Sequence, residues 1–430
     1  MYRALHLLGG LLWAAAALGQ PQPAPPVKDP LTLSEAIALA LKQSPSLEIA
    51  RQSARAAQAA FVQTKSQLYP QAIASANYTG TQSRARTTSF GGTLRTTGGT
   101  TYFRDYQTAL SYTAYQTGLH DQVRQAKEGA HAATHDSENA RRELILTVSQ
   151  DYYTLLASRR LEQVAEETLH TAEQNVTLLE AKVEQGSAAP VDVLPVKTSL
   201  ARAKAALITA QTGVRVAVAS LRKALGLPLG EDLQVVDVLA EKPVKLDLKQ
   251  SLAEALLRRP DYRAATARVT AARAALSIAR AERWPTLSVT SSVAEDWFDD
   301  QPARIWEFVG QASYPLFDAG KSKAAVTQAD ANYRVALSTR EDLELQIALD
   351  VEQAYVGVQN GGEEIAAAEA AVTEATANLE AARAKMMEGV AIAIEVSTAE
   401  DTLAQTKADY VQAVYDYNMA LAQLKAARGE

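Results

Sequence analysis

The feature that most constrains this chain is an internal duplication. The segment "LTLSEAIALALKQSPSLEIA", which begins at Leu31, resembles "LDLKQSLAEALLRRPDYRAA", which begins at Leu246. Further matches keep the same order along the chain: Pro70 with Pro285, Gly118 with Gly320, Tyr153 with Tyr355, and Gly186 with Gly389. We therefore predict one structural unit that occurs twice, at residues 31–225 and 246–430, joined by a linker at residues 226–245.

Each unit begins with a predicted helix followed by two predicted strands. The helix ends at "LYP" in the first unit and at "RWP" in the second, because proline lacks the N–H that a helix needs. Two stretches of alternating apolar and polar residues follow, most clearly "TLSVTSSV" and "IWEFVGQASYPLF". In the first unit their weaker counterparts, "QAIASANYTG" and "YFRDYQTALSYTAYQTG", flank a longer segment that holds "TTSFGGTLRTTGGTT".

The remainder of each unit predicts long helices. No proline occurs between Gly118 and Pro190, or after Pro315. A helix over residues 119–185 would be roughly 100 Å long at 1.5 Å per residue. Apolar residues recur three and four positions apart, which is coiled-coil spacing, at Ile145, Val148, Tyr152 and Leu155, and at Val193, Val196, Leu200, Ala203 and Leu207. These helices are expected to pack lengthwise against one another.

Composition excludes several classes of function. The net charge is −6 with no basic run, so no nucleic-acid partner is expected. The chain has no cysteine, so neither a disulfide nor a cysteine-linked lipid anchor is expected. No phosphate-binding glycine loop or nucleophile motif occurs. We therefore expect no enzyme activity, no catalytic residue and no cofactor.

The pair His131 and His135 was weighed as a metal site. The two side chains are four residues apart on a predicted helix, with Glu128 and Glu138 nearby, and that spacing is compatible with metal binding. The sequence fixes no third ligand. An exposed helix face is the favoured interpretation, and no metal site is predicted.

Residues 1–19 predict a cleaved signal peptide. Arg3 precedes an apolar stretch from Leu5 to Leu18, and the small residues that signal peptidase needs lie at Ala17 and Gly19. The apolar stretch is short for a membrane span and is followed by a Pro-rich segment at residues 20–30; a single anchoring helix is the alternative. No later segment has ~20 uninterrupted apolar residues, so we expect no other transmembrane helix.

The strands fit an outer membrane. About 9–11 alternating residues suffice for a tilted strand to cross it, and the tryptophans of the second unit gather at the strand ends, as in the aromatic girdles of membrane barrels. A soluble sheet with an aromatic core is the alternative. Four strands cannot close a barrel, and lipid does not tolerate an open edge. Three chains would supply twelve strands, although strand number alone does not exclude two chains.

The junctions between strands and helices carry restricted backbone residues. Gly118 and Gly320 lie where a strand meets a long helix with no polar loop between, and Pro70 and Pro285 lie where the preceding helix meets a strand. A strand can continue directly into a helix if the barrel is extended by a cylinder of helices. The residues therefore predict a mainly α protein with membrane β: a β-barrel shared by several chains, with four strands per chain, continued by a long α-helical coiled-coil tunnel.

Five sequence segments resemble the TolC-like outer-membrane efflux proteins. They are "YPQAIASA", "WPTLSVTSS", "PLFDAGKSKAA", "GSAAPVDVL" and "GVAIAIEVS", which occur in the family's order in both repeats, from Leu31 to Gly429. The resemblance implies a homotrimer: a trimeric 12-stranded β-barrel in outer-membrane lipid, continued by a long α-helical coiled-coil tunnel that spans into the periplasm. It also implies a passive exit duct for a tripartite efflux pump or type I secretion, with a periplasmic adaptor and an inner-membrane transporter as partners. The alternative is a periplasmic coiled-coil scaffold or adaptor without a pore.

The resemblance also assigns roles to the breaks between the long helices. The breaks at Gly186 to Pro190 and at Gly389 and Ala391 correspond to the tips that receive the adaptor. Asp192 and Glu395 then lie beside the periplasmic constriction, where three copies would form an acidic ring. The alternative is that each is a solvated carboxylate at the start of a helix, where negative charge is favourable in any case.

The chain departs from better-known members of this family at the second tip. Those members hold the tip closed with tyrosine, arginine and aspartate links, and here Met386, Ala391 and Thr398 occupy the corresponding places. We hypothesise that apolar packing of Met386, Ile392 and Ile394 helps to close the constriction instead.

Overall fold

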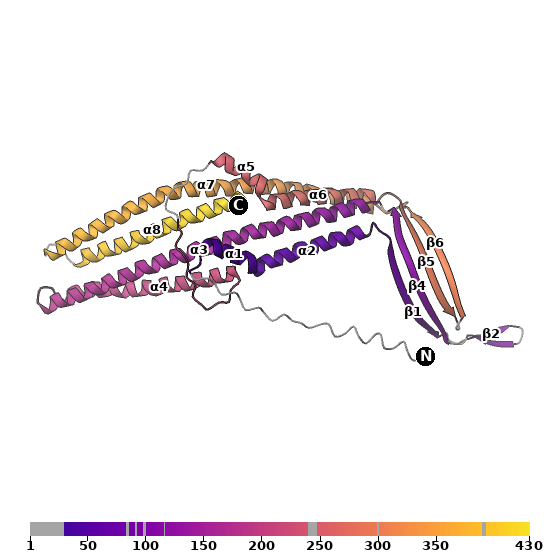
Figure 1. The fold of residues 1–430 in the computed structure, drawn as a ribbon, viewed down its shortest axis with the longest axis horizontal. Helices are drawn as coiled ribbons and strands as arrows, with labels where there is room; N and C mark the ends of the chain where they lie inside the picture. Colours follow the sequence, from indigo (N-terminus) through magenta and orange to yellow (C-terminus); the bar gives the residue numbers. More distant parts are fainter. Residues whose placement is uncertain are drawn as a thin grey trace.

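The structure, a computed structural model, describes residues 30–82, 86–90, 93–97, 100–115, 117–239, 247–298, 301–388 and 393–430. The predicted signal peptide lies outside these residues, as do most of the Pro-rich segment and part of the linker. The molecule is long and narrow, with helical hairpins at one end and a sheet at the other (Figure 1).

Four strands form one antiparallel sheet. They are β1 (Gln71–Gln82), β4 (Thr100–Tyr115), β5 (Thr286–Phe298) and β6 (Gln301–Ser313). Their order across the sheet is β1-β4-β5-β6, so each repeat contributes one neighbouring pair, and the central β4–β5 ladder joins the two repeats. These are the alternating stretches that the sequence predicted as strands. The edge strands β1 and β6 have no further strand partner within the described chain.

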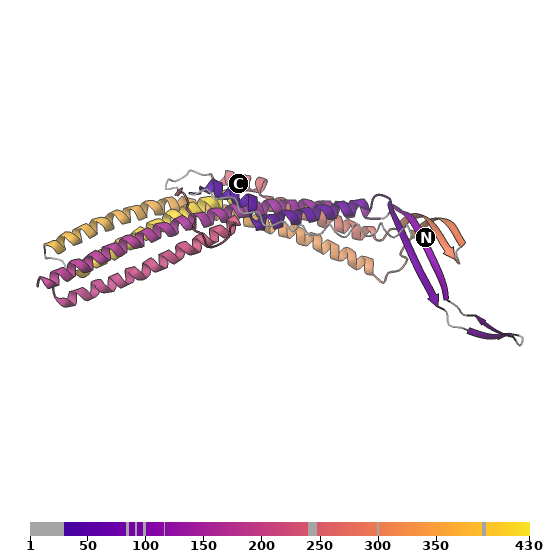
Figure 2. The same ribbon diagram turned by 60° about the horizontal axis from the view of Figure 1, so that its bottom comes forward.

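A second, two-stranded sheet lies in the longer segment of the first repeat. Strands β2 (Arg86–Phe90) and β3 (Thr93–Thr97) pair antiparallel, with Arg86 opposite Thr97. They extend the β1–β4 hairpin beyond the main sheet (Figure 2). The sequence analysis identified this insertion but did not predict strands in it.

Each repeat opens with two helices, and the prediction of a single helix is wrong. They are α1 (Leu33–Gln43) and α2 (Pro45–Ser66) in the first repeat, and α5 (Leu248–Arg258) and α6 (Pro260–Ala281) in the second. The break lies at Ser44 and Arg259, whose ψ angles are 124° and 122°. The following proline forces this extended backbone and then starts the next helix at its first position. The caps are Thr32 and Asp247.

The long helices form two hairpins, as predicted. The first is α3 (Leu119–Glu184) and α4 (Val193–Leu225), and the second is α7 (Lys321–Met387) and α8 (Ala393–Ala427). The heptad positions Val148, Tyr152 and Leu155 are fully buried between α3 and its neighbours, and Val193, Val196 and Ala203 are buried on α4. Among the described residues, no helix has both the length and the apolar character needed to cross a membrane.

The linker crosses the first hairpin near its middle. Leu31 and Val235 form a parallel bridge, and the buried Tyr152 hydroxyl donates to the carbonyl oxygens of Leu31 at 2.9 Å and Val236 at 2.6 Å. Arg160 adds an ion pair to Asp237 at 2.7 Å. One apolar core therefore includes α1, α3, α4 and the linker, and a second includes α5, α7 and α8.

Candidate functional site

The strands and helices share one lateral order. In the part of the molecule next to the sheet, α2 packs on α3, α3 on α6, and α6 on α7. Along the chain, α2 leads into β1, β4 into α3, α6 into β5, and β6 into α7. The strands, in the order β1-β4-β5-β6, therefore lie side by side in the same sequence as the helices they connect to, α2-α3-α6-α7. The sheet and the helices form one continuous curved wall (Figure 1).

The predicted junction residues lie at these transitions. Pro70 and Pro285 directly precede β1 and β5. Gly118 and Gly320 are the N-cap residues of α3 and α7, with φ of 83° and 88°. Left-handed backbone of this kind favours glycine, which has no Cβ. The backbone geometry at both junctions therefore favours glycine.

The two junctions differ in their surroundings. A Cβ on Gly118 would contact Ile278 and Ala281 of α6 at about 3.5 Å, whereas one on Gly320 would meet no described atom within 4 Å. Asp318 organises the second junction, where its carboxylate accepts from the backbone N–H groups of Gly320 at 3.0 Å and Ser322 at 2.9 Å. The hydrogen bond from the Ser322 hydroxyl, together with these two from the backbone, holds the pKa of Asp318 below its ordinary value.

The first hairpin tip is a tight, hydrogen-bonded turn. Gly186 has φ of 73°, and the Ser187 hydroxyl donates to the Lys182 carbonyl oxygen at 3.0 Å. Pro190 opens a short 3₁₀ helix, Pro190–Asp192, in which the Asp192 carboxylate accepts from the Ala189 N–H at 3.1 Å. Asp192 is exposed and lies at the N-cap of α4. The tip residues singled out from the sequence are therefore at the turn itself.

The second tip is described only on its flanks. Gly389, Ala391 and Ile392 lie outside the described residues. Glu395 is exposed in the first turn of α8, at the position equivalent to Asp192. Both carboxylates thus start a helix, where negative charge is stabilising. This placement agrees with the helix-start interpretation and is also compatible with an acidic ring.

Apolar side chains at the tips divide into two groups. Met386 packs against both apolar clusters of the hairpins, the one around Val176 and Val193 and the one around Leu379 and Val396, so it joins the two hairpins. Ile394 is about half exposed. Of the three residues expected to close the constriction by packing, Met386 makes contacts between the hairpins within this chain.

Polar contacts between the hairpins run along one face of α8 at Ser397, Glu400 and Lys407, and were not predicted. The Glu400 carboxylate, whose side chain is 11% exposed, accepts from the Asn175 amide on α3 and from Arg383 on α7 at 2.8 Å.

Two further contacts between the hairpins lie along α8 on either side of Glu400. The hydroxyls of Ser199 on α4 and Ser397 on α8 are 2.9 Å apart, and Lys407 pairs with Glu167 of α3 at 2.8 Å. We name Ser199, Ser397, Asn175, Glu400, Glu167 and Lys407 the hairpin seam.

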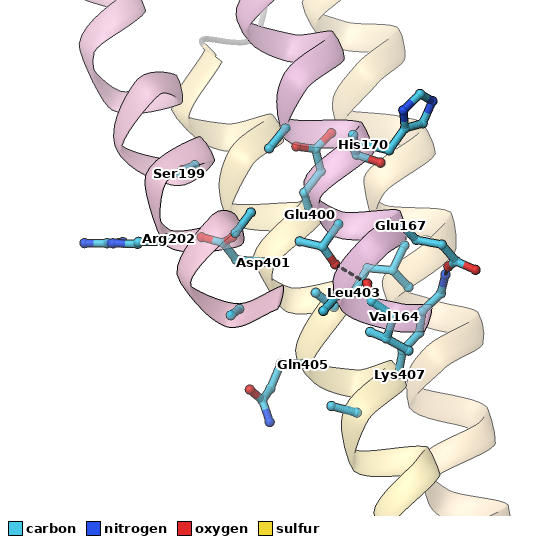
Figure 3. A pocket seen from close by; sticks show the side chains of 18 of the residues that line it. Val164, Glu167, His170, Ser199, Arg202, Glu400, Asp401, Leu403, Gln405 and Lys407 are labelled. Atoms are coloured by element: carbon cyan, nitrogen blue, oxygen red, sulfur yellow. Dashed lines mark hydrogen bonds and ion pairs between the residues drawn. The ribbon is translucent and has the colours of Figure 1, made fainter. Parts of the chain in front are cut away.

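A cavity of about 970 Å³ lies beside the hairpin seam, between α3, α4 and α8 (Figure 3). Its walls are mainly small or apolar, with Ala203, Ala206 and Gly213 on α4 and Leu403 and Ala404 on α8. Helices α4 and α8 contact each other little, whereas α3 packs along α8. The hairpin seam therefore adds polar contacts, including one between α4 and α8, to the packing of α3 on α8.

The histidine pair lies on α3. The His135 imidazole contacts the Glu138 carboxylate at 2.9 Å. No cluster of three or more metal-binding side chains occurs among the residues that the structure describes.

Known outer-membrane channels share this architecture of a strand-to-helix wall with two long hairpins. The structure is similar to that of the CmeC outer membrane channel of Campylobacter jejuni, with a TM-score of 0.82 and 19% identity, over 92% of this chain and 85% of the other. A family model described as "Outer membrane efflux protein" matches residues 36–227 and 251–430. The chain belongs to this family and is a protein of the outer membrane that extends into the periplasm.

Two curated relatives show the range of similarity. The probable efflux pump outer membrane protein TtgC of Pseudomonas putida is 30% identical over 311 residues, which is 68% of this chain but only 61% of the relative's own length. The cation efflux system protein CusC of Escherichia coli O157:H7 is 26% identical over 399 residues, which cover 89% of this chain and 82% of the relative.

Proposed function

We propose that the chain is one subunit of a passive exit duct that conducts substrates across the outer membrane. The observation that carries the proposal is the shared lateral order of strands and helices. A sheet that continues edge to edge into a layer of helices makes one wall. One vertical edge of that wall is β1 with α2, and the other is β6 with the start of α7. Among the described residues neither edge strand has a further strand partner, and no residue of α7 before Ile347 is buried.

Closure of the wall requires further copies of the chain. An unpaired strand edge inside lipid leaves backbone N–H and C=O groups without partners, which is costly. Three copies of the four-stranded sheet would supply twelve strands, an even number within the range of outer-membrane barrels. We infer a homotrimer in which β6 of one copy pairs with β1 of the next, and the helices continue the barrel as a tunnel.

The exposed sheet argues against a soluble scaffold. Large apolar side chains are exposed on one face of the sheet, at Tyr78 on β1, Leu287 on β5, and Trp306 and Phe308 on β6. A soluble periplasmic protein would bury a patch of this kind against another element. In a barrel wall, such side chains contact lipid.

The hairpin tips are the proposed docking site for a periplasmic adaptor, which would connect the duct to an inner-membrane transporter. Val191 beside the first tip and Ile394 beside the second occupy equivalent positions in the repeat and are both exposed apolar residues. With Gly186 and Pro190 at the first tip, and Gly389 and Ala391 at the second, they would offer each tip as a small apolar contact. Asp192 and Glu395, one residue further along, are the proposed acidic constriction.

Closure of the tip is proposed to depend on Met386 together with the hairpin seam. Opening would move α7 and α8 away from α3 and α4, which separates Ser199 from Ser397 and Asn175 from Glu400. Because the chain has no cysteine, S199C/S397C offers a clean test. The two hydroxyls are 2.9 Å apart, close enough for a disulfide after substitution.

The expected result is a duct that oxidation locks closed and reduction releases. Adaptor-dependent efflux should fall to the level of cells without the protein when the disulfide forms, and recover with reductant. S199C and S397C alone are the matched controls and should respond to neither treatment. Full efflux through the oxidised double variant would contradict a role for the seam in opening.

The duct itself is tested by conductance in planar lipid bilayers. The purified, detergent-extracted protein should produce discrete channel currents that are larger in Met386→Asp, because a charge there disrupts the packing between hairpins. Leu257→Asp, at an exposed position far from the tips, is the control and should resemble the parent. A protein that needs no detergent and conducts no current would favour the scaffold alternative.

A further inference from the structure

We propose that the strand–helix junction binds anionic phospholipid headgroups through a collar of exposed apolar and basic side chains. The proposal rests on the proposed function, because it requires the sheet to lie in lipid and the helices outside it. Its ligand is the phosphate-bearing headgroup region of the leaflet that faces the helices.

The apolar part of the collar consists of four side chains at the ends of the sheet. Tyr69 and Trp284 precede β1 and β5 at equivalent positions of the two repeats, and both are more than half exposed. Leu316 and Phe317 follow β6 and are 90% and 89% exposed. Apolar side chains as exposed as these mark an interaction surface when they lie together at one level of the molecule.

The turn that presents Leu316 and Phe317 is fixed rather than loose. Asp318 accepts hydrogen bonds from the Gly320 and Ser322 N–H groups and from the Ser322 hydroxyl. Ala319 has φ of 52°, a left-handed conformation that costs an alanine about 1 kcal/mol or more. Backbone strain of this kind persists where the surrounding structure holds a segment for a purpose. Here it holds two large apolar side chains away from the protein.

Basic residues form the second part of the collar, directly on the helix side. Lys65 lies in the last turn of α2, Arg283 just after α6, and Lys321 and Lys323 in the first turn of α7. All four are exposed, and none has an ion pair to a described residue. The acidic residues at this level are fewer: Glu282, Asp318, which caps the turn, and Asp121, which lies 3.9 Å from Arg124.

This arrangement matches a phospholipid from its acyl chains to its headgroup. Tyrosine and tryptophan favour the membrane interface, leucine and phenylalanine enter the acyl boundary, and lysine or arginine pairs with phosphate. Each basic residue near an anionic membrane surface contributes on the order of 1 kcal/mol. Because the basic residues lie toward the helices, the headgroups involved are those of the periplasmic leaflet. The expected preference is for phosphatidylglycerol over phosphatidylcholine.

The test is native mass spectrometry of the intact detergent-extracted protein, titrated with phosphatidylglycerol or phosphatidylcholine. The parent should bind phosphatidylglycerol with about tenfold higher affinity. K65Q/K321Q/K323Q should bind the two lipids alike. K204Q/K249Q/K385Q removes three exposed lysines elsewhere and should keep the preference. Equal binding of both lipids by the parent, or loss of the preference in both triple variants, would overturn the proposal.

A second variant distinguishes lipid from a second copy of the chain as the occupant. L316S/F317S should weaken binding of both lipids while the number of chains per particle stays unchanged. If the particle dissociates instead, these side chains lie between copies and the collar is not a lipid site. Conductance of K65Q/K321Q/K323Q should equal that of the parent. If the parent prefers phosphatidylglycerol but conducts no current, the proposed exit duct is wrong, whereas the lipid site is supported.

Discussion

The two repeats make the same close contact between helix ends halfway along the molecule, but they line it with different kinds of residue. In each repeat, the second helix of the long hairpin, α4 or α8, is followed by a glycine with left-handed backbone. That glycine lies beside the start of the helix that leads to the sheet, α2 or α6, each of which begins with proline. A Cβ on Gly226 would lie 2.8 Å from the Gln43 carbonyl oxygen, and one on Gly429 would lie 3.0 Å from the Arg258 Cβ. We call these contacts the first and second joints. Gly226 thus lies against Gln43 and Pro45 where α2 begins, and Gly429 lies against Arg258 and Arg259 just before α6 begins.

The first joint is mainly apolar; its one buried charge, Arg222 one turn before Gly226, pairs with Glu231 of the linker at 3.1 Å and so stays within the first repeat. Val148, Leu221 and Leu225 are fully buried, and the hydroxyls of Ser44 and Ser46 are 3.0 Å apart.

At the second joint the equivalents of Ser44, Ser46 and Val148 are Arg259, Asp261 and Asp350. The Arg259 side chain is 5% exposed and bonds Asp261 at 2.6 Å and Asp350 at 2.9 Å.

The second joint, unlike the first, connects the two repeats. Arg142 of α3, in the first repeat, donates to the Ala426 carbonyl oxygen at the end of α8 at 2.7 Å and lies 3.8 Å from Asp261. The ionic joint therefore connects the two repeats, whereas the apolar joint serves its own repeat. A buried ion pair adds little net stability over apolar packing, but removal of one partner is costly. An added charge should therefore destabilise the protein most at the first joint, and removal of a charge should destabilise it most at the second joint.

The largest expected effect comes from a charge placed in the apolar joint. Val148→Asp introduces the aspartate of the second joint without its arginine, and burial of an unpaired carboxylate should cost about 3–5 kcal/mol. Thermal melting of the detergent-extracted protein, followed by helical circular dichroism, should show a clearly lower midpoint. Val148→Ala is the control for lost volume and should be milder. An unchanged midpoint in Val148→Asp would mean that the first joint is not sealed from water.

A smaller effect is expected when the ionic joint loses one partner. Arg259→Ser leaves Asp261 and Asp350 without their main cation, and should cost about 3 kcal/mol. The triple variant R259S/D261S/D350V copies the first joint and should recover most of that loss. The same melting experiment measures both. A triple variant that is less stable than Arg259→Ser would contradict the equivalence of the joints.

The pH dependence separates the joints further. Burial alone would raise the pKa of Asp261, but its hydrogen bonds and ion pair with Arg259 lower it below the ordinary value. A carboxyl whose folded pKa is depressed contributes stability above its unfolded pKa, near 3.9, and that stability is lost as the pH falls through the lower folded value. The melting midpoint should therefore fall between pH 5 and pH 3 in the parent. It should fall less in R259S/D261S/D350V; an identical fall would assign the effect to other carboxyls.

The smallest effects are expected at the strand–helix junctions. Gly118→Ala and Gly320→Ala both force an alanine into left-handed backbone and should cost about 1 kcal/mol each. Ala319→Gly removes strain that has no equivalent in the first repeat, and should stabilise by a few tenths of a kcal/mol after the entropy of glycine is counted. Small midpoint shifts of opposite sign would confirm this, and a lower midpoint in Ala319→Gly would contradict it.

The sequence predicted the features that depend on local pattern. The heptad spacing around Val148 and Tyr152 gave the long hairpin helices, and alternation gave β1, β4, β5 and β6. It failed at Ser44 and Arg259, because a proline at the first position of a helix does not interrupt apolar periodicity.

Contacts between distant charged residues were also missed. Arg259, Asp350 and Glu400 resemble ordinary solvated side chains in sequence, and only the packing of separate helices buries them. Hydrogen bonds between Asn175 and Glu400, or between Ser199 and Ser397, leave no periodic signal at all.

The measurement that tests the central claim most directly is the number of chains in the detergent-extracted particle, obtained from its protein mass by light scattering or native mass spectrometry. We expect three chains, because three four-stranded sheets close one barrel and cover both open edges of the wall. A single chain that is stable in detergent would leave β1 and β6 unpaired in lipid. That result would contradict the exit duct.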